Sequence, residues 1–157
     1  MALPRENVQD YPRPPALEEV ADHISVHLGG VEIVSSTRAL RVLETHHPPT
    51  YYVPPEDIAP DVLYPVTGQS YCEWKGHAAY FDVRVGSLNR PRAAWAYPSP
   101  TPGFKPLKDF VAFYPGAMQA CFVGDVAVRP QPGDFYGGWV TENLDGLIKG
   151  SPGTLHW

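Results

Sequence analysis

Cys72 and Lys75 form the pair of residues whose types and spacing best suit covalent chemistry. A nearby ammonium group stabilises the thiolate form of a cysteine, and the thiolate is the nucleophile in reductase and acyl-transfer reactions. A cysteine that faces an apolar core is instead a small hydrophobic residue with a packing role. We take Cys72 and Lys75 as candidate catalytic residues, and the packing role of Cys72 stays the stronger alternative.

A second set of residues combines arginine with acidic and aromatic side chains from three segments of the chain. Guanidinium groups bind carboxylates and phosphates through two hydrogen bonds, and aromatic walls hold a ring or a sugar. The alternative is structural, with Arg38 paired to Glu44 and the aromatic rings in the core. We expect a pocket for a small, anionic metabolite, with Lys75 beside the candidate ligand-binding residues Arg38, Arg41, Glu44, Tyr51, Tyr52, Trp95 and Tyr97.

Metal coordination is not expected from these residue types. A four-thiolate zinc site needs four cysteines, and the chain has only Cys72 and Cys121. His46 and His47 are adjacent, and adjacent side chains of a strand point to opposite faces of the sheet. The sequence therefore predicts no metal site and no cofactor.

The elements that must position these residues are expected to be short strands. The 157 residues include 19 prolines and 14 glycines, which together disfavour long helices. The hydrophobic share of 43% and the charged share of 18% are those of an ordinary globular protein. We predict a mainly β fold, a compact domain of short antiparallel strands and hairpins with at most one or two short helices.

Alternating apolar residues on both sides of a short turn predict the first hairpin, from Ile24 to Ile33. A two-residue turn at Gly29-Gly30 would pair Val26 with Ile33 and place the apolar residues on one face.

A second hairpin is predicted to turn at Gly76-His77 and to pair Cys72 with Phe81. This register places Cys72 on the apolar face and Lys75 on the opposite one.

Further along the chain, Gly124-Asp125 predicts the turn of a third hairpin. The stretch from Ser35 to Glu44 fits either a capped helix or a strand, and both interpretations stay open. Shorter extended segments are expected at residues 51–53, 93–97 and 111–114.

Composition also divides the chain into an arm, one domain and a tail. Residues 1–19 are predicted to be an extended, proline-rich N-terminal arm, and residues 20–157 a single β domain. Gly137-Gly138 indicates a turn beside Trp139. The tail from residue 130 is expected to pack on the body through its apolar anchors Phe135, Tyr136, Trp139 and Trp157.

The net charge of −5 gives no general attraction for nucleic acid or for an anionic membrane. No apolar run approaches the roughly 20 residues of a membrane span, and the first 15 residues do not resemble a signal peptide. We expect a cytoplasmic protein with two free thiols, a small-molecule ligand, no nucleic-acid partner and no membrane partner.

Several segments together resemble the bacterial and fungal family known as domain of unknown function 427 (DUF427). The resemblance covers residues 26–114, and residues 130–157 look like an extension shared by part of the family. It implies a compact, mostly β architecture similar to the β-tent folds, which include zinc-binding and reductase domains. The segments that carry it are STRALRVLETHHPPTYYVPPEDI, YCEWKG, AAWAYPSP and FVAFYP.

The DUF427 family is sometimes labelled a nucleotidyltransferase, which the motifs of this chain do not support. Nucleotidyl transfer with two metals needs paired carboxylates around magnesium. After Gly86-Ser87 no D-x-D motif follows, and the next acidic residue is Asp109.

Three hypotheses of function follow from the sequence. The first is a β domain that binds a small molecule, with or without enzymatic activity. The second is an oligomerisation or interaction module, in which the arm and the tail dock on a partner or form a homodimer. The third is the nucleotidyltransferase that the family label suggests.

Overall fold

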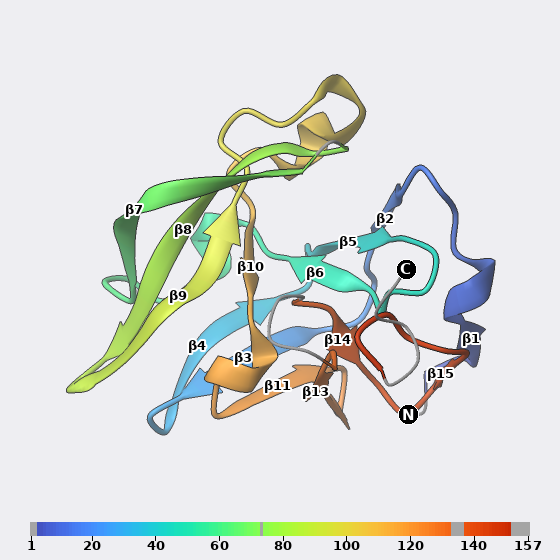
Figure 1. The fold of residues 1–157 in the computed structure, drawn as a ribbon. Helices are drawn as coiled ribbons and strands as arrows, with labels where there is room; N and C mark the ends of the chain where they lie inside the picture. The colour runs from blue at the N-terminus through green and yellow to red at the C-terminus, as the bar shows by residue number, and fades with distance from the viewer. Residues whose placement is uncertain (1–2, 73, 133–136, 152–157) are drawn as a thin grey trace.

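The computed structural model describes residues 3–72, 74–132 and 137–151 (Figure 1). Strands predominate, which confirms the predicted mainly β fold. No helix in these ranges has the length and apolar content that a membrane crossing requires. The helical elements described are short 3₁₀ helices, namely η1 (Val8–Asp10), η2 (Pro55–Asp57), η3 (Pro102–Leu107) and η4 (Pro115–Ala117).

Two antiparallel sheets of four strands form separate layers of the molecule (Figure 1). One has the order β10-β9-β8-β7, with β7 (Leu63–Cys72), β8 (Gly76–Val85), β9 (Leu88–Ala96) and β10 (Val111–Phe113). The other has the order β12-β11-β3-β4, with β3 (Ile24–Leu28), β4 (Val31–Ser36), β11 (Ala120–Val123) and β12 (Val126–Ala127).

Three smaller sheets complete the described fold. The three-stranded sheet has the order β2-β5-β6, with β2 (Ala16–Glu19), β5 (Leu40–Leu43) and β6 (Thr50–Tyr52). Two-stranded sheets join β13 (Arg129–Pro130) to β14 (Trp139–Val140) and β1 (Glu6–Asn7) to β15 (Leu144–Asp145). The β1–β15 pair is parallel.

The first predicted hairpin is present as β3 and β4, with a correction to its register. Gly29 and Gly30 have φ angles of 61° and 77°, the left-handed values that a two-residue hairpin turn requires. The predicted pair of Val26 with Ile33 is wrong, because Val26 pairs with Val34. A bulge after Val26 shifts the register by one residue and buries Ile33 as well as Val34.

The predicted register of the second hairpin is also wrong. Cys72 pairs with Gly76 instead of Phe81, so the turn precedes Gly76 and does not include it. A contact distant in sequence fixes this end of the hairpin, because the Thr101 backbone N–H donates to the Lys75 carbonyl at 3.0 Å. Local turn patterns do not include a contact of this kind, because its two residues are far apart in sequence.

Two further predictions concern the stretch from Ser35 to Glu44 and the third hairpin, and both regions form strands. The stretch from Ser35 to Glu44 contains β5 and no helix. The third hairpin turns at Gly124-Asp125 as predicted, with Val123 paired to Val126.

Segments near both ends of the described chain contact strands from its middle, namely β5 and β10. The N-terminal strand β2 pairs with β5, and Val8 of η1 is fully buried. Near the other end, Trp139 is 1% exposed, and its indole N–H donates to the Phe113 carbonyl at 3.0 Å. Of the other predicted anchors, Phe135, Tyr136 and Trp157 fall outside the described residues.

Three clusters of apolar side chains fill the interior of the described chain, and the smallest contains Val8, Tyr11 and Leu43. The largest one joins the two four-stranded sheets through buried residues such as Ile24, Val83 and Phe113. The second contains Tyr52, Trp95, Tyr97, Phe104 and Leu107. This second cluster provides the aromatic walls of the site described next.

Candidate functional site

Strands β5 and β6 divide the predicted site residues between two faces. Arg41 pairs with Tyr51, and Val42 pairs with Thr50, so each pair points to one side of the sheet. Because neighbouring residues alternate, Tyr51 and Tyr52 face opposite sides. Each face borders a separate cavity.

The larger cavity has a volume of about 340 Å³, and we call it the aromatic cavity. Its lining comes from β5, β6, β7, β8, β9 and the C-terminal segment. It brings together six of the nine predicted site residues, namely Glu44, Tyr52, Cys72, Lys75, Trp95 and Tyr97.

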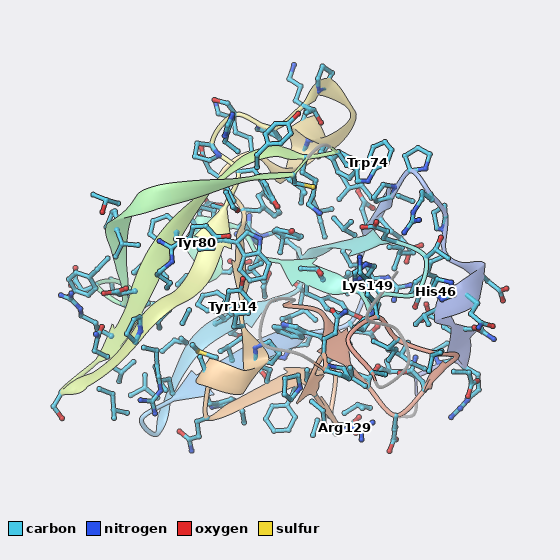
Figure 2. All side chains as sticks on the ribbon, viewed as in Figure 1. His46, Trp74, Tyr80, Tyr114, Arg129 and Lys149 are labelled. Atoms are coloured by element: carbon cyan, nitrogen blue, oxygen red, sulfur yellow. The ribbon has the colours of Figure 1, made fainter. Side chains whose placement is uncertain are left out.

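Ring contacts hold the walls of the aromatic cavity in place. The Tyr52 ring lies 6.2 Å from the Trp95 ring, nearly perpendicular to it, and also 6.2 Å from the Tyr97 ring. Trp95 and Tyr114 are closer, with ring centroids 4.6 Å apart. Figure 2 shows Tyr80 and Tyr114 beside β9 and β10.

Burial keeps the phenol groups of this wall uncharged at neutral pH. It raises the pKa of Tyr52 and of Tyr97 well above the usual range. Burial also raises the pKa of Tyr114 to about 12. The Ser70 and Tyr80 hydroxyl oxygens are 2.7 Å apart. These neutral side chains offer both ring faces and polar oxygens to a ligand.

Cationic groups border the same cavity. Lys75 Nζ lies 5.8 Å from the centre of the Tyr97 ring, and among the described residues no carboxylate is within ion-pairing distance of it. Lys149 also lines the cavity. The one acidic side chain in the described lining, Glu44, lies 3.6 Å from the guanidinium group of Arg13.

His47 lines this cavity as a neutral imidazole. Burial lowers the pKa of His47 to about 4, and the positive charges of Lys149, Lys75 and Arg13 lower it further. The Gln131 amide lies 3.2 Å from His47 Nδ1, so the neutral ring carries its proton on Nε2. The described lining therefore contains two lysines, one carboxylate and a neutral imidazole near neutral pH.

The expected separation of Cys72 from Lys75 is corrected by the structure. Both residues line the aromatic cavity, because the hairpin turns between Cys72 and Gly76. Cys72 is partly exposed, whereas Cys121 is buried in the core and burial raises its pKa to about 12. Both cysteines are free thiols.

The C-terminal segment forms a wall of the aromatic cavity that the sequence did not predict. Gly137 and Gly138 pack so closely that a Cβ at Gly137 would lie 2.2 Å from Trp95 Cη2. Gln131 is 3% exposed, and its amide donates to the Lys149 carbonyl at 2.9 Å. The available signal was the Gly137-Gly138 pair, which the sequence identifies only as a turn.

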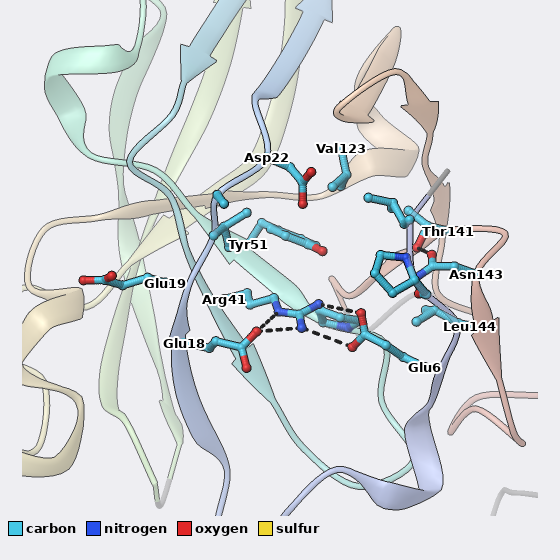
Figure 3. Close-up of a pocket in the computed structure, with 15 residues that line it drawn as sticks. Glu6, Glu18, Glu19, Asp22, Arg41, Tyr51, Val123, Thr141, Asn143 and Leu144 are labelled. Carbon is cyan, nitrogen blue, oxygen red and sulfur yellow. Dashed lines mark hydrogen bonds and ion pairs between the residues drawn. The ribbon is translucent and has the colours of Figure 1, made fainter. Parts of the chain in front are cut away.

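The smaller cavity, of about 250 Å³, surrounds Arg41, and we call it the Arg41 cavity (Figure 3). The Arg41 guanidinium group lies between two carboxylates. It donates to Glu18 at 2.8 Å and to Glu6 at 3.1 and 3.3 Å. Tyr51 lines the same cavity, and burial raises its pKa. Arg41 thus joins two N-terminal segments to β5.

Arg38 is separate from both cavities and forms a different pair from the expected one. Its guanidinium group donates to both carboxylate oxygens of Asp57, at 2.7 and 3.2 Å. The hydrogen bonds and charge of Arg38 lower the pKa of Asp57. Glu44, the alternative partner considered from the sequence, pairs with Arg13 instead.

The described residues include no group of three or more histidine, cysteine, aspartate or glutamate side chains arranged to hold a metal ion. His46 and His47 are both described, and His47 alone of the two lines the aromatic cavity.

The structure is thus that of a mainly β domain with a cavity lined by aromatic side chains and two lysines. The chain belongs to the family described as domain of unknown function DUF427, whose model matches residues 16–124. The comparison with curated proteins gave no match. The family match includes the aromatic residues of β6 and β9 and ends before the C-terminal wall, which begins at Gln131.

Proposed function

We propose that the aromatic cavity binds a small, anionic ligand that carries a planar ring. The observation that carries this proposal is the position of the Lys75 ammonium group, 5.8 Å from the centre of the Tyr97 ring in the aromatic cavity. An anionic group of a ligand can bind Lys75 while the ring contacts the aromatic wall.

The size and lining of the cavity support a ligand of this kind. About 340 Å³ is within the range of sites that hold small molecules, which combine apolar walls with a few polar groups. Tyr52, Trp95 and Tyr97 supply ring faces, and such contacts add to the apolar area that a ligand buries. The phenol groups of Tyr52 and Tyr97 stay neutral, so they do not repel an anion.

Calorimetric titration with phenyl phosphate, and with benzyl alcohol as the neutral probe, tests the proposal. The wild type is expected to bind phenyl phosphate more tightly than benzyl alcohol. Lys75→Met is expected to lower the affinity for phenyl phosphate by at least about tenfold, since a hydrogen bond to a charged group contributes about 1.5–3 kcal/mol.

Lys105→Met is the matched control, because Lys105 is exposed and lines neither cavity. This variant should bind phenyl phosphate as the wild type does. Equal affinity of the wild type and Lys75→Met for phenyl phosphate would contradict the proposal. Magnesium with ATP belongs in the same series, and stabilisation by this pair alone would favour the nucleotidyltransferase hypothesis.

A second candidate function is a cysteine-dependent reaction in the same cavity. The observation that favours it is that Cys72 and Lys75 line one cavity. An activated Cys72 would react with iodoacetamide at pH 7 faster than an ordinary peptide thiol, and Lys75→Met would slow it. The buried Cys121 serves as the internal reference. A rate equal to that of a peptide thiol would leave Cys72 with the packing role alone.

A further inference from the structure

Arg92 is a second cation that lies against the wall of the aromatic cavity, on the side of Tyr80. The Arg92 guanidinium group is 4.1 Å from the centre of the Tyr80 ring. Tyr80 lines the aromatic cavity beside β9 (Figure 2), whereas Arg92 is exposed. A ligand that occupies the cavity and extends past the Tyr80 ring would therefore meet this guanidinium group.

An irregularity in β9 brings Arg92 to this face of the sheet. In a regular strand, Arg92 and Trp95 would point to opposite faces, because they are three residues apart. The pairing of β8 with β9 shifts its register between Phe81 and Val83, and Arg92 has a φ angle of 48°. The Arg92 side chain thereby contacts Tyr80, the cross-strand partner of Trp95. Bulges that redirect a side chain in this way are frequent next to active sites.

The hydrogen bonds that hold Arg92 leave part of its guanidinium group open. The Arg92 backbone N–H donates to the Asp82 carboxylate at 2.9 Å, and Nη1 donates to the Thr67 carbonyl at 3.1 Å. The Asp82 carboxylate also lies 3.6 Å from the guanidinium group of Arg84. In the part of the chain that the structure describes, no carboxylate is within ion-pairing distance of the Arg92 guanidinium group. Its Nε and Nη2 can therefore donate to a ligand carboxylate or phosphate through two hydrogen bonds.

Lys75 and Arg92 contact opposite ends of the aromatic wall. Lys75 Nζ lies 5.8 Å from the centre of the Tyr97 ring, and Arg92 lies over the Tyr80 ring. Along β9 and the residue that follows it, extended chain separates Arg92 from Tyr97 by roughly 15 Å. Trp95 lies between these two positions and lines the cavity. A ligand that lies along the wall can thus contact one cation at each end.

We infer that the ligand of the aromatic cavity is a planar aromatic dianion with its two acidic groups at opposite ends, one bound by Lys75 and the other by Arg92. Arg92 is then the residue that selects such a dianion over a molecule with one acidic group. This inference rests on the proposed function of the aromatic cavity and specifies its ligand.

Rigid aromatic dicarboxylates, each matched with the monocarboxylate of the same ring system, are the probes for this inference. The series contains terephthalate and the linear naphthalene and biphenyl dicarboxylates, so that the distance between the two carboxylates increases in steps. In calorimetric titration the wild type should bind one dicarboxylate at least about tenfold more tightly than its monocarboxylate, because a second charged hydrogen bond forms. Two equivalent carboxylates give a preference of only about twofold by statistics, and a preference no larger than this in every pair would contradict the inference.

Arg92→Met should remove the preference for the dicarboxylate and leave the affinity for the monocarboxylate unchanged. Arg92→Lys, which keeps the charge, should retain part of the preference. Arg84→Met is the matched control, because the Arg84 guanidinium group lies 4.3 Å from the centre of the Tyr64 ring and neither residue lines either cavity. This control should keep the full preference. A purely structural role of Arg92 would instead lower the affinity for both members of a pair, and the melting temperature Tm reports the stability of each variant.

The outcomes separate the two proposals. If monocarboxylates bind through Lys75 but the wild type has no preference, or if Arg92→Met keeps the preference, the inference is wrong while the cavity remains a ligand site. If neither this series nor phenyl phosphate binds the wild type, the proposed function fails as well. If Arg92→Met loses stability, Arg92→Lys decides, and complete loss of the preference at a wild-type Tm would contradict a role through charge.

Discussion

The Arg41 cavity and the aromatic cavity lie on opposite faces of one small sheet, but their cations have different surroundings. Arg41 makes hydrogen bonds to both Glu6 and Glu18, so its charge is neutralised within the protein. Lys75 faces aromatic rings, with no carboxylate among the described residues in ion-pairing distance. A cation whose partners are already present serves the fold, and one that faces uncharged aromatic rings can serve a ligand.

Arg41→Met gives the largest expected effect on stability. The substitution removes the cation that pairs with the partly buried Glu6 and the exposed Glu18, which should lower the free energy of unfolding by about 3 kcal/mol. Affinity for phenyl phosphate in the aromatic cavity should stay unchanged. Urea denaturation and calorimetric titration measure the two effects. Arg129→Met, at an exposed position that lines neither cavity, is the control.

Acid should destabilise the aromatic cavity through His47. Its pKa of about 4 in the folded protein lies below the ordinary value of 6.5, so the unfolded chain binds the proton more readily. The contribution of neutral His47 to stability is complete above pH 6.5 and falls as the pH approaches 4, by roughly 2–3 kcal/mol. His47→Gln removes this titration.

The measurement is the free energy of unfolding from pH 7 to pH 4 for the wild type and His47→Gln. The difference between the two proteins should shrink in acid. A constant difference would mean that His47 binds its proton in the folded protein as easily as in the unfolded one.

Gly137→Ala should perturb the wall of the aromatic cavity. Its Cβ would lie 2.2 Å from Trp95 Cη2, so the segment or the ring must move, at a cost of about 1–3 kcal/mol. Binding of phenyl phosphate should weaken at the same time, because the Trp95 ring lines the site. Gly103→Ala is the control, since nothing lies within 4 Å of a Cβ there. Unchanged stability and affinity would show that the segment around Gly137 can move away from Trp95 at little energetic cost.

Arg38→Ala should have the smallest effect. Arg38 is exposed and binds Asp57, and it lines neither of the two cavities. Surface ion pairs contribute little to stability, so only a small decrease in Tm is expected. Phenyl phosphate should bind as before. A lower affinity of Arg38→Ala for phenyl phosphate would mean that Arg38 takes part in binding, as the sequence suggested.

Local patterns were sufficient to place the turns of the first and third hairpins, because these turns depend on residues next to each other. Gly29-Gly30 and Gly124-Asp125 both turn where the sequence indicates. Register was harder to predict. The bulge after Val26 has no counterpart in the alternating pattern, and the turn before Gly76 is held by the hydrogen bond from Thr101, which is distant in sequence.

The candidate site was predictable by residue type but not by position. Tyr52, Trp95 and Lys75 were chosen for their chemistry, and strands far apart in sequence bring them to one cavity. Strand alternation alone separates Tyr51 from Tyr52, so this division was available from the sequence. The roles of Gln131 and Gly137 depend on contacts with His47 and Trp95, which arise only in the folded chain.

The most direct test of the account is a nuclear magnetic resonance titration of protein labelled with ¹⁵N at tryptophan, using phenyl phosphate at pH 7.5. The Trp95 indole signal is identified with Trp95→Phe, and Trp139 is the internal reference because its indole N–H is bound to the Phe113 carbonyl in the core. We predict a saturable shift of the Trp95 signal, a much smaller shift for Trp139, and weaker saturation in Lys75→Met. A Trp95 signal that stays unchanged at saturating probe would contradict a ligand site in the aromatic cavity.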